Sequence, residues 1–184
     1  MKRAMVVAGI LLAMLVVVGC GKKDSAVPMS DTVNNAAGIQ WKVPVGWSPQ
    51  GERMMRAATY TIPMAEGDAE SGECAVFFFG TGQGGGVDMN IERWASQFSE
   101  KPAVSKSATE INGLSVTKVE IAGNYLAPAG PMMESQGTKE NFLLLGAIVE
   151  APGGYVFFKS TGPKKTMEGA KPAFEALLST LEKQ

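Results

Sequence analysis

Two turn signals, each between segments of strand length, most constrain how this chain can fold. The first is Asn112-Gly113, two residues that tolerate the positive φ angles of a two-residue hairpin turn. The second is Ala151-Pro152-Gly153-Gly154, a run of turn-forming residues. Strands joined by tight turns lie antiparallel, so we predict two hairpins in a mainly antiparallel sheet. Their strands are expected at 104–111, 114–122, 141–150 and 155–160.

Three upstream segments also have strand patterns. In 39–43 apolar and polar residues alternate, which indicates a half-buried strand, and a turn follows at 44–47. Segment 54–62 is a second expected strand. Segment 74–79 is an apolar run of strand length, so we predict a central strand covered on both faces.

A segment in the middle of the chain has the helical period instead. In 88–99, Ile91, Trp94 and Phe98 recur on one face, and polar residues occupy the other. We therefore predict that Trp94 and Phe98 anchor the core rather than stack on a ligand. Asp88 is the expected N-cap of this helix.

A second helical segment lies at the end of the chain, where an apolar stripe runs along 167–181. Pro172 lies inside the stripe and leaves two interpretations open. Either it kinks one helix, which we favour, or the regular helix begins beside it with the proline in the first turn. Hairpins with one inserted helix and one terminal helix predict an α+β sandwich.

The N-terminal residues have the pattern of an export signal. Two basic residues precede an uncharged apolar run over 4–18, which is shorter than the roughly 20 residues that a transmembrane helix needs. Small residues then lead to Cys20, as in the lipobox of bacterial lipoproteins. We predict that 1–19 is a signal peptide and that Cys20 is acylated after cleavage. The lipid would hold the protein on an envelope membrane facing the periplasm, and Gly21 favours the outer membrane.

This interpretation divides the remaining chain into two parts. Segment 20–38 comprises the lipidated cysteine and a small, polar, aperiodic stretch that predicts a flexible tether. Segment 39–184 is long enough to bury a core and is expected to form a single globular domain.

The composition argues against several classes of function. The chain has no histidine, which removes the commonest catalytic arrangements and the usual transition-metal ligand. Its formal net charge of −1 gives no drive toward nucleic acid. Cys74 has no partner once Cys20 carries lipid, and it is expected to be a buried small hydrophobe. We therefore expect no enzymatic activity, no cofactor and no metal site.

Three motifs suggest ligands but have better structural explanations. Segment 80–85 matches the dinucleotide pattern G-x-G-x-x-G, but hairpins rather than βα units follow it, so we predict a pliable strand-to-helix connection. The acidic segment 66–73 is an incomplete calcium loop and is expected to be a solvated turn. The methionine pairs lack the spacing of copper sites and are expected to fill gaps in the core or a loop.

Two loops are candidate contact surfaces. One is the glycine-rich connection, through Gly82, Gly84 and Gly85. The other is the long connection 125–140, where Met132 and Met133 are expected to be exposed. Loops of this length within a compact domain often carry function.

Four segments carry a family resemblance. They are W-K-V-P-V-G-W at 41–47, F-F-K-S-T-G-P at 157–163, the closing helix at 174–181, and 79–98, which is similar to a pattern in uncharacterised bacterial lipoproteins. Together they make the domain resemble the PsbP-like superfamily. The resemblance implies an α/β/α sandwich with a central, mainly antiparallel sheet flanked by helices. The superfamily includes a photosystem accessory subunit and a nuclear-import factor that binds a small GTPase, and most characterised members bind or assist other proteins. No functional residue is carried over, because the matching motifs are structural.

The combined expectation is a lipid-anchored envelope protein whose domain is a non-catalytic binding or accessory module for another protein. The alternative is a small-ligand carrier with a cleft beside 80–86 or 125–140. A histidine-free hydrolase built on a carboxylate pair is less favoured. The expected partners are a membrane, through the lipid, and a protein, with no nucleic acid and no nucleotide.

Overall fold

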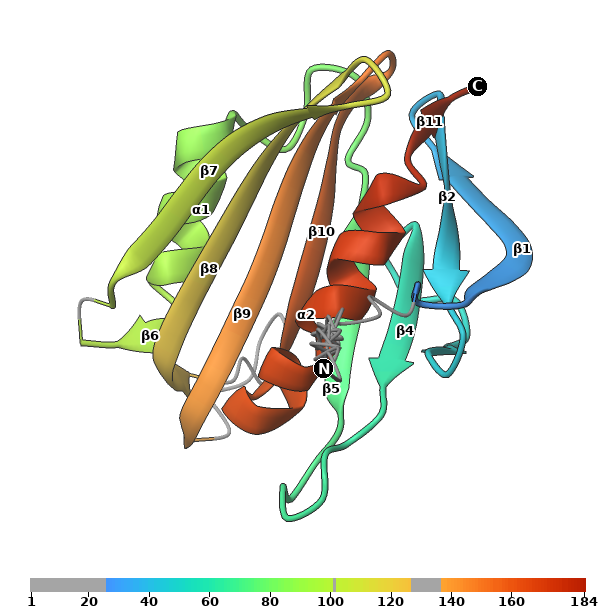
Figure 1. The fold of residues 1–184 in the computed structure, drawn as a ribbon. Coiled ribbons are helices and arrows are strands. Elements are labelled where there is room, and N and C mark those ends of the chain that lie inside the picture. The colour runs from blue at the N-terminus through green and yellow to red at the C-terminus, as the bar shows by residue number, and fades with distance from the viewer. Residues whose placement is uncertain (1–25, 101, 127–136) are drawn as a thin grey trace, which may run out of the picture.

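The computed structural model describes residues 26–100, 102–126 and 137–184 (Figure 1). The helices within these ranges are α1 (Val87–Ala95) and α2 (Lys164–Ser179). The strands are β1 (Met29–Ala36), β2 (Ile39–Pro44), β3 (Ser48–Pro49), β4 (Ala58–Ile62), β5 (Gly72–Phe77), β6 (Phe98–Ser99), β7 (Val104–Ile111), β8 (Leu114–Leu126), β9 (Thr138–Ala151), β10 (Gly154–Pro163) and β11 (Glu182–Lys183). In the described ranges, no helix has the length and apolarity needed to cross a membrane.

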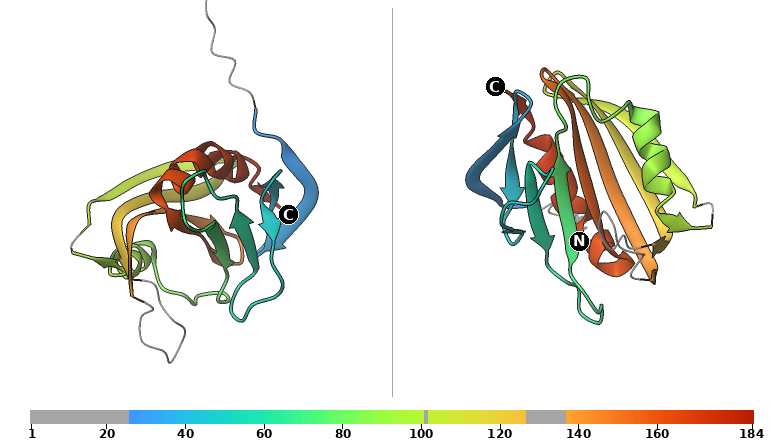
Figure 2. Two further views of the ribbon diagram at one scale, coloured as in Figure 1. Left: turned by 90° about the horizontal axis from the view of Figure 1, so that it is seen from below. Right: turned by 180° about the vertical axis from the view of Figure 1, so that it is seen from behind.

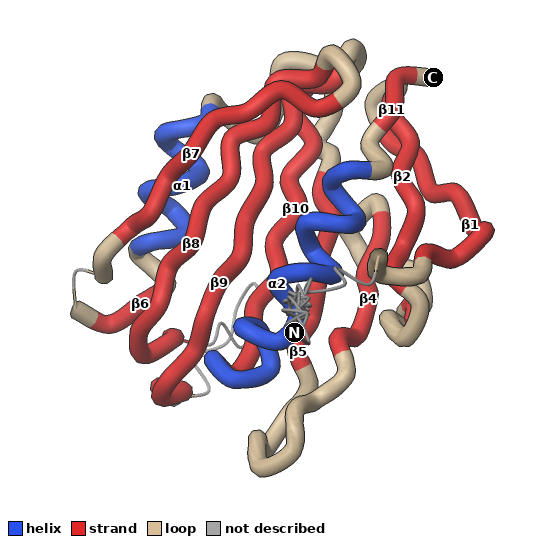
Figure 3. Tube along the Cα trace, viewed as in Figure 1, coloured by secondary structure: helices blue, strands red, loops and turns tan. Residues whose placement is uncertain are grey.

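Most strands form one antiparallel sheet in the order β3-β4-β5-β10-β9-β8-β6, and β7 also pairs with β8 (Figure 3). The remaining strands form a three-stranded sheet in the order β1-β2-β11. Both predicted hairpins are present, as β7-β8 and β9-β10. In the first turn, Asn112 and Gly113 have φ angles of 50° and 75°. The predicted α+β class with a mainly antiparallel sheet is therefore confirmed.

Helix α2 packs with β2 against one face of the large sheet. Trp41 of β2 meets Phe158 of β10 edge-on, with 5.2 Å between ring centroids. Its indole N–H donates a hydrogen bond to the Tyr60 hydroxyl at 3.0 Å, which supplies the partner that a buried indole needs. Cys74 lies in this core, free and buried as predicted. Burial raises the pKa of its thiol to about 12, so the thiol remains protonated.

Helix α1 packs against the opposite face, as the views in Figure 2 show. Ile91 and Trp94 of α1 join Phe98 of β6 in a second buried cluster. The Trp94 ring occupies the space above Gly146 of β9, where an added Cβ would lie 2.3 Å from a ring carbon. The predicted core roles of Trp94 and Phe98 are confirmed.

The predicted tether needs correction. Strand β1 occupies Met29–Ala36 and pairs with β2, so the ordered domain starts before residue 39. Its sequence, MSDTVNNA, has little apolar periodicity. An edge strand is held mainly by backbone hydrogen bonds, so a sequence of this kind can pair without an apolar pattern.

Several elements differ in extent from their predictions, two of them for a visible reason. The strand expected at 54–62 begins only at Ala58, because the chain turns at Met54 and Met55 with a φ of 64° at Met55. Helix α1 ends at Ala95 and its N-cap is Gly86, so the prediction of Asp88 as N-cap is wrong. Asp88 instead lies in the first turn, where its charge favours the positive end of the helix dipole.

The C-terminal helix begins well before its proline. Pro172 lies inside α2, so the interpretation in which the helix starts beside the proline is wrong. The N-cap is Pro163, which makes no side-chain hydrogen bond. Asp68, from the turn before β5, supplies one instead: its Oδ2 accepts from the Thr166 backbone N–H at 2.8 Å and from the Thr166 hydroxyl at 2.6 Å.

Candidate functional site

The strongest candidate site lies on the face of the large sheet that α1 occupies, beside that helix. A cavity of about 360 Å³ is bounded there by β5, β10 and the neighbouring strands. We call it the Lys159 cavity. Its charged lining residues are Arg53, Arg56, Glu70, Glu73, Lys139 and Lys159. Four cations against two carboxylates leave the cavity with an excess of positive charge.

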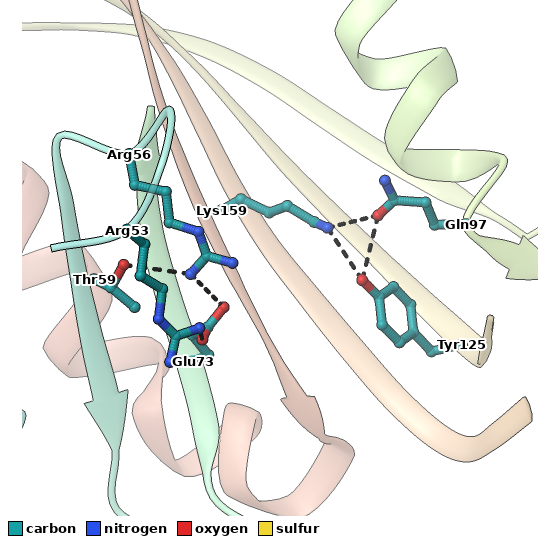
Figure 4. Close-up of polar contacts among 7 residues, drawn as sticks. All are labelled: Arg53, Arg56, Thr59, Glu73, Gln97, Tyr125 and Lys159. Atoms are coloured by element: carbon teal, nitrogen blue, oxygen red, sulfur yellow. Dashed lines mark hydrogen bonds and ion pairs between the residues drawn. The ribbon is translucent and has the colours of Figure 1, made fainter. Parts of the chain in front are cut away.

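Lys159 comes from the middle of β10, where side chains alternate between the two faces. Val156 and Phe158 face the α2 core, and Phe157 joins the α1 core, so Lys159 projects on the α1 side. Figure 4 shows the lysine reaching across the sheet toward Gln97 and Tyr125. Its Nζ donates to Gln97 Oε1 at 2.5 Å and to the Tyr125 hydroxyl at 3.1 Å.

Among the described residues, both hydrogen-bond partners of Lys159 are neutral. The Tyr125 hydroxyl donates onward to Gln97 Oε1 at 3.4 Å. Burial, with a smaller contribution from the Glu73 carboxylate, raises the pKa of Tyr125 to about 12, so the phenol keeps its proton. Among the described residues, no carboxylate lies within 4.0 Å of the lysine amine. Within the described part of the chain, the ammonium is therefore hydrogen-bonded but not neutralised.

The environment of Lys159 lowers its pKa to about 8. Burial is the largest cause, because it disfavours the charged form, and the Arg56 guanidinium adds repulsion. The Glu73 carboxylate opposes both effects. An amine with this pKa is still largely protonated at pH 7.

The two arginines come from the connection between β3 and β4 and share one acid. Arg53 and Arg56 each place Nη1 on a different oxygen of Glu73, at 2.9 Å and 2.8 Å. Arg56 also lies over the Phe77 ring, 5.5 Å from its centroid, and donates to the Thr59 hydroxyl. This arrangement fixes a guanidinium pair at one side of the cavity (Figure 4).

The fourth cation of the cavity has its own acid. Lys139 of β9 forms an ion pair with Glu70 at 2.5 Å, and its amine lies 5.5 Å from the centroid of the Phe142 ring. Three of the four cations are thus paired with carboxylates, and Lys159 is the exception among the described residues.

A smaller cavity adjoins the first. It measures about 180 Å³, and we call it the aromatic cleft. It is lined by Phe77, Phe79, Asn90, Arg93, Trp94, Gln97, Phe157 and Lys159. Phe77 and Lys159 line both cavities, so the two share a wall.

The glycine-rich connection has a clear structural role. The side-chain amide of Asn90 donates to the carbonyls of Gly84 and Gly86 at 2.9 Å and of Gly85 at 3.3 Å. The loop therefore wraps around a residue of the helix that it precedes, and its carbonyls converge there. A phosphate cradle requires converging N–H groups instead.

Of the predicted contact surfaces, Gly82, Gly84 and Gly85 do not line the Lys159 cavity, whereas Tyr125 and Lys139 of segment 125–140 do. Gly84 lies against the rings of Phe79 and Phe157, and Gly82 has open space where a Cβ would be. Met132 and Met133 fall outside the described residues. Three acids of segment 66–73 have separate partners: Asp68 contacts α2, Glu70 pairs with Lys139, and Glu73 pairs with the two arginines. Within the described residues, no group of three acidic or thiol side chains is placed to hold a metal ion.

Sequence reasoning missed the cationic residues of the site because they are spread from residue 53 to residue 159. One signal was available. Lys159 interrupts β10 between Phe158 and Ser160, in a strand with neighbours on both sides. Lysine is rare in such a position unless its amine has a specific partner or task.

Comparisons with known proteins support the fold and no more. No protein-family model and no curated protein matches the chain. Among solved structures, the chain is similar to cyanobacterial PsbP from Synechocystis sp. PCC 6803, with a TM-score of 0.55 and 14% identity over 91% of this chain and 99% of that one. A protein of unknown function from Pseudomonas aeruginosa matches with a TM-score of 0.46 and 12% identity, over 83% and 94% of the two chains. The first similarity shows that the chain has a PsbP-like fold, as the sequence motifs implied.

Proposed function

We propose that this chain is a lipid-anchored envelope protein without catalytic activity, and that its domain binds an anionic group in the Lys159 cavity. The anchor rests on the lipobox-like residues before Cys20. The binding role rests on the cavity, and above all on Lys159. A partly buried ammonium with only neutral hydrogen-bond partners among the described residues leaves its charge available to a ligand.

The energetics of a buried charge favour this interpretation. Removing an ammonium from water is unfavourable unless another charge compensates it. Within the described residues the carboxylates of the cavity are already engaged with other cations. A ligand carboxylate or phosphate at Lys159 would supply the missing charge, and Arg56, which also lines the cavity, can add a second donor.

At pH 7 the Lys159 amine is mostly protonated, so its main property is a positive charge that can pair with an anion. The neighbouring phenol has its pKa raised rather than lowered, so it is not activated. Binding therefore accounts for the arrangement better than turnover does.

The test is anion binding by the full-length protein, measured by isothermal titration calorimetry with acetate and with inorganic phosphate. We expect Lys159→Gln to weaken binding by about tenfold or more, since a charge-assisted hydrogen bond contributes about 1.5–3 kcal/mol. The matched control is Lys42→Gln, which changes an exposed lysine of β2 and should leave binding unchanged. If the wild-type protein binds neither anion, or both variants bind as it does, the proposal is wrong.

The anion can come from an acidic residue of a partner protein or from a small free molecule. The cavity volume, about 360 Å³, lies within the range of small-ligand sites and favours keeping the carrier function as the alternative. A native mass spectrum of protein purified from its own envelope separates the two sources. A carrier retains a small bound mass, whereas a module for a protein partner does not.

A further inference from the structure

We propose, resting on the anion-binding function above, that the ligand is a small aromatic acid. Its carboxylate or other anionic group would lie at Lys159, and its ring would lie in the aromatic cleft. The juxtaposition of the two cavities, rather than either alone, carries this inference.

The Lys159 cavity and the aromatic cleft share a wall. Lys159 and Phe77 line both cavities, and the hydrogen-bond partners of the lysine divide between them: Tyr125 lines the Lys159 cavity and Gln97 lines the aromatic cleft. The lysine amine thus stands at the border between a charged space and an apolar one. A ligand that contacts the amine can extend into the cleft without leaving the site.

Three phenylalanine rings, those of Phe77, Phe79 and Phe157, form a platform in the cleft. Phe77 and Phe79 stack with 5.8 Å between centroids and 15° between planes, and Phe79 meets Phe157 at 5.8 Å. Phe77 and Phe79 are only partly buried, although large aromatic side chains are stabilised by full burial. A flat ring placed against them would cover this apolar surface.

The size of the cleft limits which ligands can enter it. The cleft measures about 180 Å³. An apolar cavity of about 150 Å³ in another protein is large enough to hold benzene. One phenyl ring therefore fits, and a long acyl chain does not fit within the cleft alone.

The charge of the cleft also favours an acid as the ligand. The cleft is lined by Arg93 and Lys159 and by no acidic residue among those described. Arg93 is exposed and held toward Asn90 by a hydrogen bond from its Nη1 to Asn90 Oδ1 at 3.0 Å. Both ends of the combined site therefore favour an anion over a cation or a neutral aromatic molecule.

The experiment compares benzoate, cyclohexanecarboxylate and acetate as ligands of the full-length protein at pH 7, by isothermal titration calorimetry. We expect benzoate to bind about tenfold or more tightly than acetate, because burial and stacking of the ring add to the affinity. Cyclohexanecarboxylate, which is apolar but not flat, should fall between the two.

Two matched variants test the platform. Phe79→Leu removes a ring of the cleft but keeps an apolar side chain, and it should lower the preference for benzoate while leaving acetate binding unchanged. Phe78→Leu is the control, because Phe78 packs against the core on the α2 side. Thermal unfolding of both variants verifies that each is folded.

The outcomes separate this inference from the proposed function. If acetate and benzoate bind equally and both depend on Lys159, the aromatic ligand is ruled out and the anion site stands. If Phe79→Leu and Phe78→Leu have the same effect on the benzoate preference, the platform is ruled out. If no anion binds, both proposals are wrong.

Discussion

At the scale of single residues, Lys159 makes a pH dependence the sharpest expectation. Its pKa is about 8 in the folded protein, so the ammonium loses its charge as the pH rises through that value. Anion affinity should therefore be highest below pH 7 and decline between pH 7 and 9. Calorimetry across this range measures the decline, and at pH 8 binding should take up protons because a bound anion favours the charged amine. Affinity that does not change from pH 6 to 9.5 would contradict this role.

The same residue predicts a gain in stability from its removal. The pKa of Lys159 in the folded protein lies below the unfolded value of 10.5. Burial of the charged amine therefore lowers the free energy of unfolding by its full amount below pH 8, and this loss disappears as the pH rises from 8 to 10.5. Lys159→Met should raise the free energy of unfolding at pH 7 by about 1–3 kcal/mol. Denaturant titrations at pH 7 and pH 10 measure this, and the gain should shrink at the higher pH. A variant that is less stable than wild type at pH 7 would show that the lysine supports the fold.

Gly146 has no side chain, and this lets the Trp94 ring of α1 pack directly against β9. Gly146→Ala would place a Cβ 2.3 Å from the buried ring of Trp94, so we expect a loss of about 1–3 kcal/mol in unfolding free energy. Gly169→Ala is the control, because nothing lies within 4 Å of its Cβ position on α2 and alanine is the better helix former. Thermal unfolding should show opposite shifts for the two variants.

At the scale of elements, α2 depends on a cap from another part of the chain. Asp68 accepts two hydrogen bonds from Thr166 in the first turn of the helix. Asp68→Ala should destabilise the protein by about 1–2 kcal/mol, as the loss of an N-cap does. Asp68→Asn keeps an acceptor and should cost less, and urea denaturation ranks the two. Equal losses would assign the effect to charge rather than to hydrogen bonding.

The same element shows where periodicity succeeds and where it fails. The apolar stripe correctly predicted a C-terminal helix, since burial of one face decides its position. The helix start was not predicted, because Asp68, which accepts the hydrogen bonds of Thr166 in the first turn, lies 98 residues away from it in the sequence. Strand β1 was missed for a related reason: the backbone pairs it with β2, and its side chains carry little pattern.

At the scale of the whole molecule, the topology creates the candidate site. The Lys159 cavity forms where β5 pairs with β10, which brings Glu73 and Lys159 onto neighbouring strands. Arg53 and Arg56 arrive from a connection that the sequence assigned partly to a strand. Sequence alone predicted the sheet that makes such pairing possible, but strand order between distant segments determines which charges meet. That order is not encoded in any local pattern.

The proposed anchor predicts how the whole molecule distributes in the cell. Cys20→Ala removes the thiol that would be acylated, so the variant should leave the membrane fraction. Cys74→Ala changes the buried cysteine and should fractionate as wild type does. Immunoblots of membrane and soluble fractions compare the two. A Cys20→Ala protein that stays with membranes would contradict the anchor.

The pairing of β1 with β2 has a mechanical consequence. Met29 pairs with Pro44, so the incoming chain and the chain that continues into the domain leave this hairpin at the same end. A force applied to the N-terminus would then load the hydrogen bonds of the hairpin one at a time rather than all together, so the hairpin would open at low force. Releasing the eight residues of β1 would lengthen the extended chain that precedes the domain by roughly 25–30 Å. The large sheet contains neither β1 nor β2, so its strand pairing would stay intact.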